Sequence, residues 1–189
     1  NEYQSLINDC GLSTVVLDVD AFALSNMYEV NYELPEMETI ALVNVGASSV
    51  NIHILRDGHS SFTRDLGIGG RQFTEEIQRT LNISYEEAEA LKVGDDEDGQ
   101  SMIPEEAEQI LVNVSETIGT EVQRSLDFYL STSADTGLTR IYLAGGAART
   151  PGLARIISTH TNLPCEILDP FRKVQIDERE INPGYLLDL

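Results

Sequence analysis

Hydrophobic and polar residues follow two different periods along this chain. Residues 40–45 are almost entirely apolar, and residues 50–55 alternate apolar with polar side chains, so both stretches predict strands. The pair Asp57–Gly58 is typical of a hairpin turn, and residues 60–64 offer a third strand, which predicts three consecutive antiparallel strands. Residues 104–129 instead repeat apolar positions every three or four residues. This spacing predicts one long helix with a single buried stripe.

The remaining stretches interleave helices and strands. The expected helices span residues 1–10, about 20–28, 71–81, 84–92 and about 151–160, and the further expected strands are residues 15–19, 140–144 and 164–168. Asp20 is a suitable helix cap, and Ser84 with Glu87 has the spacing of a capping box. Residues 31–37, which contain Pro35, form the best candidate boundary. Interleaved helices and strands with an early hairpin predict an α/β fold with a mixed sheet.

The charge of the chain limits the classes of partner that it is expected to bind. The 189 residues hold 12 Lys and Arg against 32 Asp and Glu, a formal charge of −20. Such a chain has no basic stripe for nucleic acid, and an anionic membrane surface repels it. Lys92 is one of only two lysines, so a bound phosphate would depend on backbone N–H groups, a metal or a few arginines. No apolar run reaches the roughly 18 residues of a spanning helix, so we expect no direct membrane insertion.

The sulfur and acidic residues add little chemistry. The two cysteines have neither metal-ligand spacing nor a disulfide framework, which favours a reducing compartment. The acidic run in residues 94–100 is expected to be a solvated loop, because it lacks the ligand spacing of an EF-hand. The three histidines form no metal spacing. The chain begins without Met and ends on an apolar stretch, so we expect a truncated fragment.

Two glycine-containing turns could approach a phosphate. The first, between two expected strands, contains Gly46, Ala47, Ser48 and Ser49, whose small side chains would expose backbone N–H groups and hydroxyls. The second places Gly69 and Gly70 before a helix, although the spacing does not match the dinucleotide-binding fingerprint. Taken alone, the first turn is better explained as a plain hairpin turn of small residues, and the second is only a weak indication of an anion site.

Two further motifs follow along the chain. Glu89 and Lys92 lie three residues apart, on one face of a predicted helix, where a surface ion pair is the simplest interpretation. Gly145 and Gly146, followed by Arg149, come directly after a predicted strand. The carboxyl ends of strands in open α/β sheets are where ligands bind, although a tight strand-to-helix turn explains the glycines equally well.

The order of these four motifs resembles the second half of the actin-like ATPase fold, which is ribonuclease H-like, with a mixed sheet and flanking helices. Residues 62–70 and 88–92 are similar to the PilM family of type IV pilus assembly proteins, relatives of the cell-division protein FtsA. The resemblance implies that residues 1–36 are the end of a first lobe and a connecting helix. It implies that residues 37–189 are the second lobe, with a small helical subdomain at about 70–115.

The resemblance also implies a nucleotide site. The turn from Gly46 to Ser49 would face the phosphates of ATP, while Gly69 and Gly70 would line the cleft. By the same resemblance, the ribose and adenine would be met by Glu89 and Lys92, and the adenosine by Gly145, Gly146 and Arg149. The implied partner is the cytoplasmic tail of an inner-membrane protein, PilN, bound mainly by the first lobe. The implied location is cytoplasmic, peripheral at the inner membrane.

Two departures bear on the chemistry. The first phosphate hairpin of the superfamily is absent, and Asn44 stands where the second phosphate loop usually has Asp. A neutral amide binds Mg²⁺ less well than a carboxylate, so we expect a nucleotide-binding scaffold more than a working ATPase, with weak ATP and Mg²⁺ binding in this chain alone. An FtsA-like division protein, a sugar- or acyl-kinase-like enzyme and a purely structural domain remain alternatives.

Overall fold

The structure, a computed structural model, describes residues 2–33, 37–93, 103–134 and 137–175. Its centre is a five-stranded sheet in the order β3-β2-β1-β4-β5. The strands are β1 (Thr39–Val45), β2 (Val50–Arg56), β3 (His59–Leu66), β4 (Arg140–Ala144) and β5 (Cys165–Ile167). The first three strands pair antiparallel, whereas β4 is parallel to both β1 and β5. The predicted mixed sheet is therefore confirmed.

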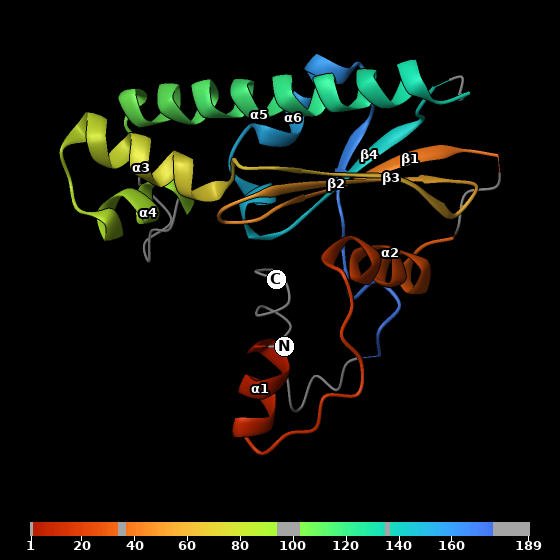
Figure 1. Ribbon diagram of the computed structural model, residues 1–189. Coiled ribbons are helices and arrows are strands. Elements are labelled where there is room, and N and C mark those ends of the chain that lie inside the picture. Colours follow the sequence, from red (N-terminus) through yellow and green to blue (C-terminus); the bar gives the residue numbers. More distant parts are fainter. Residues whose placement is uncertain (1, 34–36, 94–102, 135–136, 176–189) are drawn as a thin grey trace.

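Helices cover both faces of this sheet (Figure 1). On one face lie α5 (Glu105–Thr132) and α6 (Leu153–Thr161), and on the other lies α2 (Asp20–Asn31). The pair α3 (Gly70–Leu81) and α4 (Tyr85–Val93) extends beyond the end of the sheet, beside the first half of α5. A short 3-10 helix, η1 (Gly146–Arg149), follows β4, while α1 (Glu2–Asp9) lies apart from the sheet.

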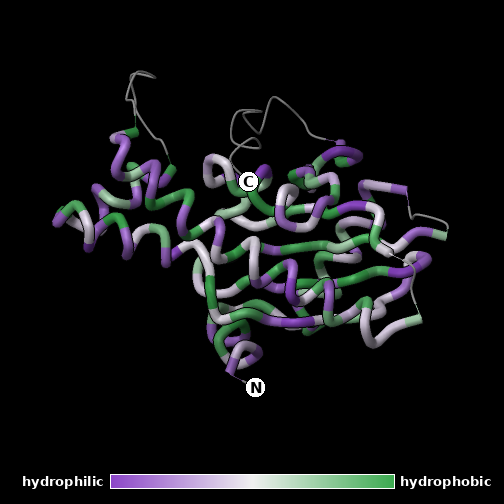
Figure 2. The backbone as a smooth tube through the Cα atoms, turned by 90° about the horizontal axis from the view of Figure 1, so that it is seen from above, coloured by the Kyte–Doolittle hydropathy of each residue, from purple (hydrophilic) through white to green (hydrophobic). Residues whose placement is uncertain are grey.

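The larger core lies between the sheet and α5. Ile52 and Ile54 of β2 face it, as the alternation in the sequence predicts. Figure 2 shows hydrophobic stretches running through the sheet, whereas hydrophobic and hydrophilic residues alternate along the helical pair α3 and α4. Every apolar position of the predicted helical stripe is buried, which confirms it: Ala107, Ile110, Leu111, Val114, Ile118, Val122, Leu126 and Tyr129.

Aromatic rings hold α2 against the opposite face. Tyr28 and Tyr32 stack in parallel with ring centroids 5.0 Å apart, and the ring of Tyr142 on β4 lies 5.2 Å from that of Tyr28. Tyr28 is 2% exposed, and its burial raises the pKa of its phenol well above the usual value. The guanidinium of Arg172 lies 4.9 Å from the ring of Tyr32, the residue after α2, and this contact ties the segment after β5 to the end of that helix.

Two local signals in the sequence produce the expected geometry. Asp57 and Gly58 both have positive φ angles, 52° and 75°, as a two-residue hairpin turn requires. The capping box before α4 is present: the Ser84 N–H donates to the Glu87 carboxylate at 2.8 Å, and the Glu87 N–H donates to Ser84 Oγ at 3.2 Å. The bond from the Ser84 backbone N–H, helped by the Ser84 side chain, favours the ionised carboxylate and holds the pKa of Glu87 below its ordinary value.

The predicted strand at residues 15–19 is wrong. This stretch contains no strand, and its apolar side chains are exposed, Val15 by 90% and Leu17 by 60%. A strand needs a neighbour to satisfy its backbone groups, and the residues that the structure describes supply none here. Asp20 is also not the helix cap: α2 begins at Asp20, and Val19 holds the cap position without a side-chain bond.

Smaller differences concern where helices begin and end. The helix α2 runs to Asn31, Pro104 occupies the cap position before α5, and η1 fills the turn that we expected to lead directly into the helix at Pro151. The expected acidic loop at 94–100, Pro35 in the boundary loop and the apolar chain end lie outside the described residues. No helix in the described ranges has the length and apolarity that crossing a membrane requires. The division into two lobes stays a prediction.

Candidate functional site

Three turns that the sequence singled out meet at one end of the sheet. The carboxyl ends of β1 and β4 are neighbours because these strands are parallel. The β1–β2 turn is closed by the Gly46 N–H, which donates to the Ser49 carbonyl at 2.9 Å. The start of α3 is joined to this turn, since the N–H groups of Gly70 and Arg71 donate to the carbonyls of Gly46 and Ala47, both at 2.8 Å.

Gly69 and Gly70 are buried under this turn. A Cβ on Gly69 would lie 2.6 Å from the Gly46 carbonyl oxygen and 2.8 Å from that of Ala47, closer than packed atoms tolerate. A Cβ on Gly70 would lie 2.7 Å from the Cβ of Ala147. These glycines therefore allow the three turns to approach one another. The first N–H groups of α3 are already bonded within the chain, so they shape the site without pointing freely at a ligand.

The turn after β4 is equally tight on one side and open on the other. Gly145 has a φ of +88°, and a Cβ there would collide with Asn44 Oδ1 and with the Val45 carbonyl oxygen. The next residue, Gly146, is exposed, and a Cβ there would meet nothing within 4 Å. Gly145 is thus required by the fold, whereas the open space beside Gly146 is available to a ligand.

A cavity of about 380 Å³ lies where these strand ends meet α2. Its polar lining consists of Asp20 at the start of α2, Asn44 near the end of β1 and Arg149 at the end of η1. The rest of the wall is apolar or glycine and comprises Ala23, Leu24, Met27, Ala144, Gly145, Ile167, Leu168 and Pro170. The sequence reasoning missed Asp20 because it assigned this carboxylate to a helix cap. The sequence did contain a signal for this position: Asp20 directly follows an apolar run and begins a helix.

Glu89 and Lys92 are brought together as predicted, but with a third residue. Lys92 Nζ lies 2.5 Å from Glu89 Oε1 and donates to Thr74 Oγ1 at 3.2 Å, and the Thr74 hydroxyl donates to Glu89 Oε2 at 2.5 Å. Thr74 is fully buried on α3, one turn after Gly70. Partial burial opposes ionisation of Glu89, yet the bonds from Lys92 and Thr74 prevail and lower the pKa of its carboxyl. The three residues lie on α3 and α4 and do not line the cavity.

Other titratable groups lie away from the turns. His53 on β2 is 1% exposed, neither ring nitrogen has a hydrogen-bond partner, and burial lowers the pKa of its imidazole. Burial likewise raises the pKa of the Cys165 thiol to about 12, which makes it a poor nucleophile. Within the described part of the chain, no three His, Cys, Asp or Glu residues are arranged to hold a metal ion.

Comparison with known proteins identifies the family. The sequence model of the family described as "Type IV pilus assembly protein PilM" matches residues 1–187. The chain belongs to the PilM family. This assignment confirms the resemblance that the motifs indicated.

Solved structures share the fold of this chain. The PilM-PilN type IV pilus biogenesis complex contains a chain with 26% sequence identity and a TM-score of 0.76, covering 93% of the present chain and 49% of that one. MreB 5 of Spiroplasma citri bound to AMPPNP aligns with a TM-score of 0.66 at 14% identity, over 98% of the present chain and 64% of that one. The predicted actin-like fold is therefore confirmed.

One curated relative shows the same partial coverage. The ethanolamine utilization protein EutJ of Escherichia coli (strain K12) is 26% identical over 124 residues, which is 66% of the present chain and 39% of EutJ. The present chain thus spans about half the length of the matching chain in the PilM-PilN complex, and a smaller share of EutJ.

Proposed function

We propose that this chain is the nucleotide-binding half of an actin-like scaffold for type IV pilus assembly. The observation that carries the proposal is the convergence of the β1–β2 turn, the start of α3 and the Gly145–Gly146 turn on one end of the sheet. The fold match to MreB 5 with bound AMPPNP supports ATP as the ligand of this end. Membership of the PilM family supports the role in pilus assembly.

Neutral groups would hold most of the nucleotide. Ala47 and Ser48 are exposed at the tip of the β1–β2 turn, where backbone N–H groups and the serine hydroxyl could donate to phosphate oxygens. The adenosine would lie in the open space beside Gly146, with Arg149 at its border. With a formal charge of −20, the chain depends on such backbone donors and on few cations.

Mg²⁺ fits this site only together with the nucleotide. Asp20 and Asn44 line one cavity, and carboxylate and amide oxygens are ligands that Mg²⁺ prefers. Two protein oxygens leave the remaining positions to phosphate oxygens and water. The ion would neutralise phosphate charge in an otherwise acidic protein. Because Asn44 is neutral, we infer that binding, more than hydrolysis, is the function of the site.

Glu89 and Lys92 would contact the ribose and adenine from α4. Their bonds to the buried Thr74 fix both side chains on the helical pair. A ligand that reaches this pair would find side chains that are already ordered, so little rotamer entropy would be lost on binding.

The partner would be the cytoplasmic tail of a PilN-like protein, as the structure of the PilM-PilN complex suggests. We infer that a first lobe, outside this chain, binds that tail and packs against the exposed apolar residues of the segment before α2, Val15, Val16, Leu17 and Val19. The protein would then act in the cytoplasm and reach the inner membrane through its partner. Binding ATP between two lobes would favour the closed arrangement by its differential affinity.

Affinity measurements with a fluorescent ATP analogue test the site. Gly146→Val places a side chain in space that no protein atom occupies, so it should leave the fold intact and weaken binding at least tenfold. Gly67→Val is the matched control, because a Cβ there also meets nothing within 4 Å and lies in a different turn. Equal affinity of both variants and the unaltered chain would refute the site. A pull-down of the full-length protein with a PilN tail peptide tests the partner separately.

A further inference from the structure

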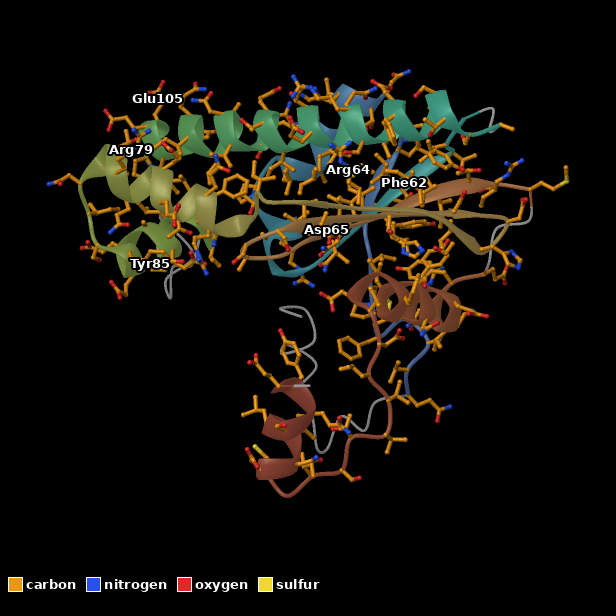
Figure 3. The ribbon with its side chains drawn as sticks, viewed as in Figure 1. Phe62, Arg64, Asp65, Arg79, Tyr85 and Glu105 are labelled. Atoms are coloured by element: carbon orange, nitrogen blue, oxygen red, sulfur yellow. The ribbon has the colours of Figure 1, made fainter. Side chains whose placement is uncertain are left out.

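A row of polar side chains crosses three strands and ends at the candidate site. Asn44 on β1 pairs in register with Asn51 on β2, which pairs with Asp65 on β3. The side chains are hydrogen-bonded along this row: Asn51 Nδ2 donates to Asp65 Oδ1 at 2.7 Å, and Asn44 Nδ2 donates to Asn51 Oδ1 at 3.4 Å. Figure 3 labels Asp65 on β3, at the outer end of the row.

The charge at the outer end determines the direction of every bond in the row. An ionised carboxylate has no hydrogen and can only accept, so Asn51 must turn its NH₂ group toward Asp65. Its carbonyl oxygen then faces Asn44 and can only accept as well. Asn44 therefore turns its NH₂ group toward Asn51, which leaves its oxygen on the other side. That oxygen is directed at Gly145, where a Cβ would collide with Asn44 Oδ1.

We propose that Asp65 is a positioning residue that, through Asn51, fixes the Asn44 amide with its oxygen toward the cavity. This inference rests on the proposed nucleotide site. An amide in the opposite orientation would offer a donor, which suits a bare phosphate. The fixed orientation offers an acceptor at the cavity that Asp20 also lines, which suits a cation or a cation-bound water. The row thus makes the end of β1 selective for nucleotide that carries a divalent cation.

This arrangement gives a function to the neutral side chain of Asn44 at a position where a carboxylate would be the alternative. A carboxylate at this position would add another negative charge to a cavity that already contains Asp20. The oriented amide supplies an oxygen without that charge. Asp65 itself is exposed on the edge strand β3, so its own carboxylate stays solvated while its influence reaches the cavity through two hydrogen bonds.

The test compares Asp65→Asn with Asp127→Asn. Asp65→Asn keeps the shape but can donate, so the row can reverse and Asn44 can present its NH₂ group. Asp127 is an exposed carboxylate on α5 that also accepts from an amide, Gln123 Nε2, at 2.8 Å, so its variant removes the same charge and the same kind of bond elsewhere. The first readout needs no ligand: the side-chain NH₂ resonances of Asn44 and Asn51 in a ¹⁵N spectrum should move in Asp65→Asn and stay in Asp127→Asn.

The second readout is the ratio of affinities for ADP with and without Mg²⁺. We expect Asp65→Asn to lower this ratio at least fivefold and Asp127→Asn to leave it within twofold. Unmoved Asn44 resonances, or an unchanged ratio in Asp65→Asn, would overturn the proposal. If the unaltered chain binds no ADP while the Asn44 resonances still respond to Asp65→Asn, the nucleotide site fails and the orienting row stands.

Discussion

The N–H of Gly70 lies 2.8 Å from the carbonyl oxygen of Gly46, so the start of α3 is hydrogen-bonded to the turn between β1 and β2. This contact requires glycine at position 69, where a Cβ would approach the same carbonyl oxygen to 2.6 Å. We expect Gly69→Ala to lower the free energy of unfolding by about 1–3 kcal/mol, as overpacking does. Urea denaturation measures this change.

Gly67→Ala provides the control in the same turn, since a Cβ at this position meets nothing within 4 Å. It should change the free energy of unfolding by less than about 0.5 kcal/mol. Equal stability of the two variants would mean that the turn and α3 are not packed as described.

The second prediction concerns acid stability. His53 is buried without a hydrogen-bond partner, and its pKa in the folded protein lies below the ordinary 6.5. Below pH 6.5 the unfolded chain therefore binds a proton that the folded chain does not. The stability lost through this group reaches at most about 1.4 kcal/mol per pH unit and stops increasing below the folded pKa. His53→Leu should flatten the fall in unfolding free energy between pH 7.5 and 5.5.

His59 is the comparison histidine, because it is exposed at the start of β3, directly after the hairpin turn. His59→Gln should retain the pH dependence of the unaltered chain. A His53→Leu variant with the same dependence as the unaltered chain would show that another group is responsible.

The third prediction concerns the network on α3 and α4. The Thr74 hydroxyl donates to Glu89 and helps to lower the pKa of that carboxyl. Thr74→Val removes the donor at similar size, so the pKa of Glu89 should rise toward 4.5. The stability from these bonds is present above pH 4.5 and is lost as the pH falls through the lower folded pKa. An NMR titration of the Glu89 carboxyl carbon measures the shift, and Thr80→Val, on the exposed side of α3, should leave it unchanged.

The fourth prediction contrasts two leucines. Leu17 is 60% exposed in the segment before α2, whereas Leu143 on β4 is fully buried. Leu17→Ser should change the free energy of unfolding of this chain by no more than about 0.5 kcal/mol, and Leu143→Ala should lower it by about 2–5 kcal/mol. Thermal unfolding distinguishes these outcomes, and a large effect of Leu17→Ser would show that the segment packs against the chain.

The sequence correctly predicted helices and strands whose apolar pattern faces a single hydrophobic core. The stripe of α5 and the alternation of β2 each face the same hydrophobic layer, so their periods in the sequence match the structure. The predicted strand at residues 15–19 was wrong because an apolar run indicates only a preference for burial, whereas a strand also needs a neighbouring strand to pair with. The sequence cannot show whether that partner is present.

Parts of the candidate site depend on contacts between distant residues. Thr74 and Glu89 are 15 residues apart, and only the packing of α3 against α4 brings them together. The row from Asn44 to Asp65 depends on the register of the strands. The hydrophobic pattern restricts this register, but the presence of Asn residues in the sequence does not reveal which of them pair across strands. Asp20 reaches the cavity because α2 packs over the end of β1.

Mapping amide chemical shifts during an ADP titration shows whether nucleotide binds at the converging turns. Weak binding suffices for this measurement. We expect the largest shifts in residues 44–49 and 144–149, and we expect these shifts to disappear in Gly146→Val. Shifts confined to other parts of the chain, or the same shifts in Gly146→Val, would contradict it.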